Sequence, residues 1–200
     1  MIAHALDQVG RDGVVTVEEA KGFDTTVEIV EGMQVDRGYV SPYFVTNGEK
    51  MTAELKNPYI FITTRKLTSL SDIVTVLEGI VQQSKPVLFI AEDVEGDALQ
   101  GLVVNKMKGI VEACAITSPG FGAGRIEMID DIATLTGATV ISDANSLGFN
   151  DVKLEHLGTA KKVICSRTRT IIVGGAQKAK EVKTRIKDLR KRIKDSAISE

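Results

Sequence analysis

The stretch KPVLFIAEDVEGDALQGLVVNKMKGIVEACAI, residues 85–116, indicates the fold class. Its first part, 85–93, is an apolar run typical of a buried strand and ends in acidic residues. The middle part, 97–108, has the length and spacing of a helix, and the last part, 110–116, is a second apolar strand. Strands that alternate with helices predict an α/β domain.

The alternation continues on both sides of this stretch. Strands are predicted at 14–17, 25–30, 51–55, 58–64, 138–142, 161–166 and 170–175, and helices at 2–9, 70–83, 126–137 and 176–195. Residues 31–44, EGMQVDRGYVSPYF, are predicted to form a loop with turns, because Gly32, Gly38 and Pro42 interrupt them. The first half is rich in strands, so a β-sandwich flanked by helices and a Rossmann arrangement both fit.

Composition excludes several classes of protein. The 200 residues are 43% hydrophobic and 26% charged, as in ordinary globular domains, and the formal net charge is −2. No apolar run approaches the roughly 20 residues of a membrane helix, so no membrane partner is expected. The segment 178–195 is basic, but we expect a solvated helix face there rather than a nucleic-acid site. Cys114 and Cys165 lie in apolar runs and are predicted to be buried thiols, although a disulfide stays open.

Two groups of residues resemble sites for small ligands. GFGAGR (120–125) lies between a strand and a helix, and Asp143 follows at the distance of a ribose-binding acid, so a nucleotide-binding enzyme is one alternative. Arg125 stands where that fingerprint needs a small residue, and a structural turn is the competing interpretation. The acidic residues of 92–97 are expected to favour a helix N-terminus, and we predict neither a catalytic nor a metal site.

A third feature is a surplus of apolar residues on two helices. The apolar arc of helix 97–108 is about 240° wide, whereas a surface helix needs only about 100° to cover a core. Helix 70–83 is also broadly apolar, and Tyr39, Tyr43 and Phe44 lie in the neighbouring loop. Two interpretations stay open at this point: a surface for peptides or proteins, or a large core with one tucked-in loop.

The string EGMQVDRGYVSPYF closely resembles the start of the apical domain of group I chaperonins, the GroEL type. The similarity continues through 85–110, 118–125 and 130–142, and GRDGVVTVEEAKG (10–22) resembles the adjoining part of the intermediate domain. It covers essentially the whole chain. One departure is GFGAGR, where the family usually has GFGDRR.

The resemblance implies an α/β fold with a β-sandwich-like core flanked by helices, of the swivelling β/β/α type. It divides the chain into a fragment of the intermediate domain at 1–31 and an apical domain at 32–200. It implies a chaperone function: non-native polypeptides bind in an apolar groove between helices 70–83 and 97–108. The family's polypeptide-binding residues correspond here to Tyr39, Tyr43, Phe44, Val74, Leu77, Leu99, Val103 and Val104.

The resemblance also implies partners and a context. A GroES-type co-chaperonin would dock its mobile loop on the same groove, and Gly32 would be a hinge. The nucleotide-binding and catalytic motifs of the family are absent from these residues, so the fragment is expected to need no cofactor and to have no enzyme activity. The full-length parent would be a double-ring ATPase that uses ATP and Mg, whereas the fragment is expected to be monomeric. Bacterial cytoplasm, mitochondrial matrix and plastid stroma all fit.

Overall fold

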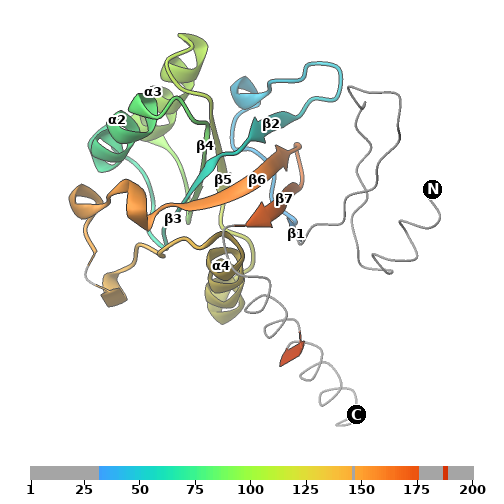
Figure 1. Cartoon of the computed structure of the whole chain (residues 1–200), viewed down its shortest axis with the longest axis vertical. Coiled ribbons are helices and arrows are strands. Elements are labelled where there is room, and N and C mark those ends of the chain that lie inside the picture. Colours follow the sequence, from blue (N-terminus) through green and yellow to red (C-terminus); the bar gives the residue numbers. More distant parts are fainter. Residues whose placement is uncertain (1–31, 146, 176–186, 189–200) are drawn as a thin grey trace, which may run out of the picture.

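A set of parallel strands forms the centre of the molecule (Figure 1). The computed structural model describes residues 32–145, 147–175 and 187–188. Strands β3 (Tyr59–Ile62), β4 (Val87–Ala91) and β5 (Ala113–Thr117) are neighbours in that order. Every residue of β4 is buried, as expected of a parallel strand covered on both faces. The strands predicted at 58–64, 85–93 and 110–116 are therefore confirmed.

Two helices connect these strands and lie together in Figure 1. Helix α2 (Val74–Gln82) joins β3 to β4, and helix α3 (Gly96–Met107) joins β4 to β5. Because both crossovers add the next strand on the same side, right-handed connections place both helices on one face of the parallel strands. The predicted helix 97–108 is confirmed. The predicted helix 70–83 is divided at Ile73 into a 3₁₀ turn, η2 (Leu70–Asp72), and α2.

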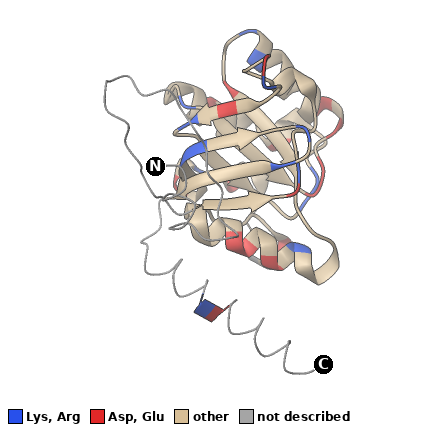
Figure 2. Ribbon diagram, turned by 90° about the vertical axis from the view of Figure 1, so that its right-hand side faces the viewer, with Lys and Arg blue, Asp and Glu red and all other residues tan. Residues whose placement is uncertain are grey.

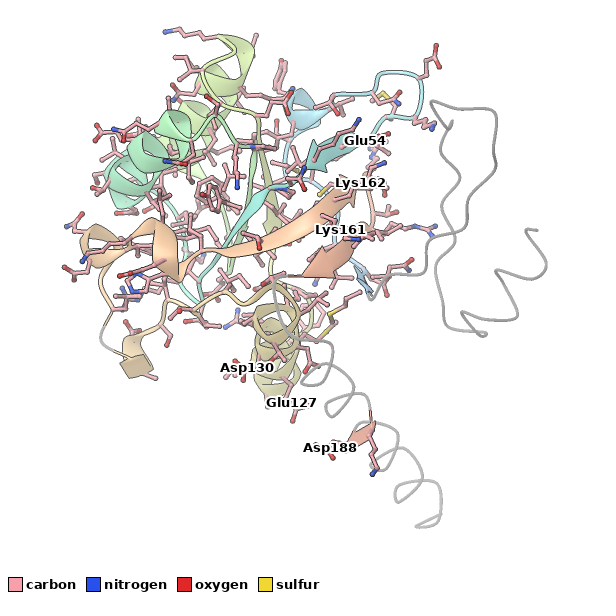
Figure 3. All side chains as sticks on the ribbon, in the orientation of Figure 1. Glu54, Glu127, Asp130, Lys161, Lys162 and Asp188 are labelled. Carbon is pink, nitrogen blue, oxygen red and sulfur yellow. The ribbon has the colours of Figure 1, made fainter. Side chains whose placement is uncertain are left out.

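Strand β6 (Gly158–Cys165) joins the parallel strands to an antiparallel set. Its first residues pair with β3, and its remainder pairs with β7 (Thr170–Gly175) on one side and β2 (Ala53–Lys56) on the other. Strand β1 (Gly32–Val35) completes the set by pairing with β7. Across β2 and β6, Glu54 Oε2 lies 3.7 Å from Lys162 Nζ, a diagonal ion pair (Figure 3).

Helix α4 (Gly122–Thr136) lies away from α2 and α3 in Figure 1 and contacts β1, β3, β6 and β7. It ends at Gly137, whose left-handed conformation (φ 74°) favours glycine. Figure 2 marks its acidic residues in red along the helix, and the exposed Glu127 and Asp130 point away from the strands in Figure 3. The prediction placed this helix at 126–137, but it begins four residues earlier. The remaining elements are 3₁₀ turns: η1 (Pro42–Phe44), η3 (Asp143–Asn145), η4 (Phe149–Asp151) and η5 (Leu154–His156).

Two local predictions are wrong. Residues 32–35 form β1 rather than a loop, because their partner β7 lies far along the chain and only Val35 is buried. Residues 138–142 do not form a strand. Only Ile141 pairs with the sheet, in a single bridge to Thr63 just after β3. A longer pairing is prevented because β6 already occupies this edge at Tyr59 and Ile60, the first half of β3.

The α/β class predicted from the sequence is confirmed, with a mixed seven-stranded sheet. The strands share hydrogen bonds through β6, so the β-sandwich-like description stays a prediction. The elements predicted at 2–9, 14–17, 25–30 and 176–195, and the intermediate-domain fragment 1–31, lie outside the described residues.

None of the described helices is both long enough and apolar enough to cross a membrane.

Gly38 offers a test of how closely two distant segments approach. A Cβ at this position would collide with the backbone of Ser166 and Arg167. We expect Gly38→Ala to lower the free energy of unfolding by about 1–3 kcal/mol, since backbone atoms must move to make room. Urea unfolding measures this change. Gly48→Ala is the matched control, because nothing lies within 4 Å of its Cβ position. Equal unfolding midpoints for the two variants would contradict the close approach.

Candidate surface for polypeptide binding

Helix α3 lies between two turns that come from distant parts of the chain. On one edge, Lys106 Nζ donates hydrogen bonds to the carbonyl oxygens of Tyr43 at 2.8 Å and Val45 at 3.0 Å, which ties α3 to η1. On the other edge, Gly101 faces η2, and a Cβ on residue 101 would lie 2.5 Å from Leu70 Cδ1. The glycine therefore allows η2, which leads directly into α2, to approach α3 closely.

The side of α3 that faces solvent carries several apolar residues. At about 100° per residue, the Gly101 and Lys106 edges are about 140° apart across the buried side, which carries Ala98 and Leu102. The remaining arc carries Leu99, Val103, Val104 and Met107 together with Gln100 and Asp97. Val104 is 46% exposed and Met107 68% exposed. We call Leu99, Val103, Val104 and Met107 the α3 apolar stripe.

Three of the predicted site residues lie on this stripe. Leu99 and Val103 are half-buried and lie toward the η1 edge, whereas Val104 lies toward the η2 edge. The broad apolar arc predicted from the sequence is thus exposed in part, rather than wrapped by protein on all sides. Such an arrangement can bind another apolar surface without covalent chemistry.

The loop residues Tyr39, Tyr43 and Phe44 have different environments. Backbone hydrogen bonds from Tyr39 N–H to Ser166 O (3.1 Å) and from Val40 N–H to Ala115 O (2.9 Å) hold the loop against β5 and β6. Tyr43 is 61% exposed on η1, at the same edge of α3 as Lys106. Phe44 has no exposed surface and belongs to the core. A side chain with no exposed surface cannot contact a ligand in this conformation, so Phe44 supports the loop instead.

The two residues predicted on the first helix also differ. Val74 is exposed at the first turn of α2, immediately after η2. Leu77 is only 6% exposed and packs with Val76 and Ile80 in the core. One turn of α2 thus contributes to the surface, whereas Leu77 contributes to the packing of the helix on the strands.

Sequence reasoning omitted two residues from the proposed site. Met107 continues the stripe of Leu99 and Val103 at i, i+4 spacing, so the helical pattern contained the signal. Ile110 is also exposed and follows α3 after Gly109, which has φ 69°. Ile110 lies beyond the end of α3, so the helical periodicity could not predict that its side chain is exposed.

The Gly-rich segment 120–125 joins β5 to α4 through residues with left-handed backbone. Gly120 has φ 82° and Gly122 has φ 55°, which explains glycine at both positions. Residues 122–125 are the first turn of α4 rather than a loop. Arg125 in this first turn donates from Nη1 to Glu92 Oε1 at 2.8 Å, and Glu92 directly follows β4.

The two halves of the predicted nucleotide site are not brought together in the described residues. Asp143 follows the segment that pairs with β3 at Thr63, and its carboxylate forms an ion pair with Arg65. The segment before Asp143 pairs with β3 on the edge opposite β4, so Asp143 and the Gly-rich segment after β5 lie roughly three strand spacings apart, about 14 Å. Among the described residues there is also no group of three or more His, Cys, Asp or Glu side chains placed to hold a metal ion.

Gly32, the predicted hinge, is the first residue of β1. A Cβ there would lie 2.8 Å from the carbonyl oxygen of Ile172 on β7, so the close approach of two strands accounts for glycine. The hinge role stays a prediction.

No protein-family model matches the chain.

Phe44 and Tyr43 are adjacent, and their substitution separates a core role from a surface role. We expect Phe44→Ala to lower the free energy of unfolding by about 3–5 kcal/mol, because it removes a fully buried ring. Tyr43→Ala is the matched control and should change it by less than about 0.5 kcal/mol. Urea unfolding of both variants measures these free energies of unfolding. A similar decrease for both variants would contradict the assignment of Phe44 to the core.

The Glu92–Arg125 pair predicts a pH effect. The hydrogen bond and the charge of Arg125 lower the pKa of Glu92 below its ordinary value. A lowered carboxyl pKa stabilises the fold above the pKa of the unfolded chain, and this contribution is lost as the pH falls through the folded-state value. We expect Arg125→Gln to raise the pKa of Glu92, and its stability cost to be present above about pH 5 and to vanish in acid. Carboxyl NMR titration measures the pKa. Lys66→Gln is the control and should shift it less, because Lys66 is the weakest of the contributing groups.

Proposed function

We propose that this chain is a polypeptide-binding module of the group I chaperonin type, and that it captures non-native polypeptides on the surface formed by η1, α3 and the start of α2. The resemblance of residues 31–44, 85–110, 118–125 and 130–142 to the apical domain of that family supports the proposal. The observation that carries it is the exposed α3 apolar stripe, flanked by exposed Tyr43 and Val74.

The composition of this surface suits a ligand without a fixed shape. Valine, leucine, methionine and tyrosine side chains gain roughly 25 cal/mol for each Å² of apolar surface removed from water, whatever the sequence of the ligand. The unbranched side chain of Met107 can adapt to different partners, as methionine does on other promiscuous surfaces. An extended segment or one face of an amphipathic helix would fit between α2 and α3, where we place the groove.

Several further statements belong to the same proposal. A GroES-type co-chaperonin would compete for the α3 stripe and displace the bound polypeptide. A single surface of this kind binds weakly, so a ring of copies in an ATP-driven parent would supply the avidity. Residues 1–31 would belong to the intermediate domain, and the compartment would be a bacterial cytoplasm or an organelle matrix or stroma.

The alternative, a nucleotide-binding enzyme that uses residues 120–125, has less support. Asp143 is paired with Arg65 beside β3, and Glu92, the acid at the end of the strand next to β5, is paired with Arg125. We therefore expect no saturable binding of fluorescent ATP or NAD analogues by the 200-residue chain. Nucleotide binding without polypeptide capture would favour the alternative.

A charge on the α3 stripe should abolish capture. We expect Val104→Glu to weaken binding at least roughly tenfold, because a carboxylate would have to be buried beneath an apolar ligand. Fluorescence anisotropy of a labelled, reduced and carboxymethylated protein, which cannot refold, measures the affinity of the 200-residue chain. Ile126→Glu is the matched control, since Ile126 is 54% exposed but lies on α4.

The outcomes of this experiment distinguish a binding site on α3 from a general effect of added charge. Equal weakening by both substitutions would indicate a general effect of charge and contradict a site at α3. Unchanged binding by Val104→Glu, with folding confirmed by circular dichroism, would sink the proposal. A peptide with the sequence of a co-chaperonin mobile loop, added to the unsubstituted chain, should compete with the labelled protein.

A further inference from the structure

Two buried thiols from different parts of the sheet meet in the core. Cys114 is the second residue of β5 and Cys165 is the last residue of β6, and neither side chain has exposed surface. Both cysteines are free. Burial, and after it the neighbouring Cys165 thiol, raise the pKa of the Cys114 thiol well above its ordinary value.

The backbone around the two cysteines confirms that the strands are close at this point. Tyr39 N–H donates to the carbonyl oxygen of Ser166, the residue after Cys165, at 3.1 Å. Val40 N–H donates to the carbonyl oxygen of Ala115, the residue after Cys114, at 2.9 Å. Consecutive Cα atoms are only about 3.8 Å apart, so residues 39–40 hold β5 and β6 together beside the thiols.

We propose that Cys114 and Cys165 are an oxidisable pair whose disulfide cross-links β5 to β6. The bond would close residues 114–165 into a covalent loop that contains α4. It would also fix the two strands to which the loop carrying Tyr43 is hydrogen-bonded. This inference does not depend on the polypeptide-binding function.

The oxidant is a low-molecular-weight disulfide. One cysteine loses its proton and attacks a sulfur of that disulfide, which breaks the S–S bond and releases one thiol. The second cysteine then attacks the mixed disulfide on the protein and releases the second thiol. The protein loses two hydrogens and gains one S–S bond, while the small disulfide is reduced to two thiols.

Burial determines when this reaction occurs. A thiolate is the reactive species, and the closed core disfavours it and excludes the oxidant. Oxidation should therefore require opening of the core, for example at the 39–40 contact. Once the disulfide forms, it restricts the opened chain and makes further opening rarer. The pair thus responds to an oxidant only in molecules that have already begun to unfold.

The experiment incubates the 200-residue chain with oxidised glutathione, with and without urea below the unfolding transition. We expect an intramolecular Cys114–Cys165 linkage, identified by mass spectrometry of the unreduced peptides, to form at least roughly tenfold faster with urea. The oxidised chain should unfold at a temperature higher by roughly 5–10 °C, and dithiothreitol should reverse the shift.

The single variants Cys114→Ala and Cys165→Ala are the controls. Each should acquire only a glutathione adduct, in urea, without the rise in unfolding temperature; circular dichroism checks that both fold. Glutathione adducts on both cysteines of the unsubstituted chain would overturn the proposal, and so would failure to form the linkage in urea. A linkage that lowers the unfolding temperature would overturn it as well, because it would mean that the native strands must separate to form the bond.

Discussion

The arrangement of the molecule depends on the pairing of β6. This strand contacts β3 through its first residues and β7 and β2 through the rest, so it belongs to both the parallel and the antiparallel strands. Each backbone N–H and C=O of a buried strand must find a partner. Because β6 supplies these partners on two edges, the parallel unit that carries α2 and α3 and the antiparallel set that carries β1 share one core.

That common core determines which side chains are left at the surface. Residues 39–40 are held by Ser166, which follows β6, and by Ala115 in the middle of β5, and this places η1 against α3. Gly101 lets η2 approach the opposite edge of α3. With both edges occupied and Ala98 and Leu102 buried, Val103 is only half-covered, and Val104 and Met107 are exposed beside Gln100 and Asp97. A surface helix needs apolar residues only on the side that packs on the core, which is why we interpret the α3 apolar stripe as a binding surface.

The same geometry explains why similar residues have different roles. Tyr43 and Phe44 are adjacent, yet one is exposed and the other is fully buried, because successive residues of a 3₁₀ turn point about 120° apart. The glycines of 120–125 resemble a nucleotide fingerprint, but their positive φ angles account for Gly120 and Gly122. Glu92 is paired with Arg125, and Asp143 with Arg65.

The sequence by itself determined the α/β class, the strands at 58–64, 85–93 and 110–116, the helix 97–108 and its excess of apolar surface, because these follow from local periodicity and from apolar runs. Only the tertiary structure decided that 32–35 is a strand, that 138–142 is not, and that Phe44 and Leu77 are buried while Met107 is exposed. These features depend on partners far along the chain, such as β7 for β1 and η1 for α3. The contact between Cys114 and Cys165 belongs to the same class, since pairing between distant strands leaves no periodic signal in either segment.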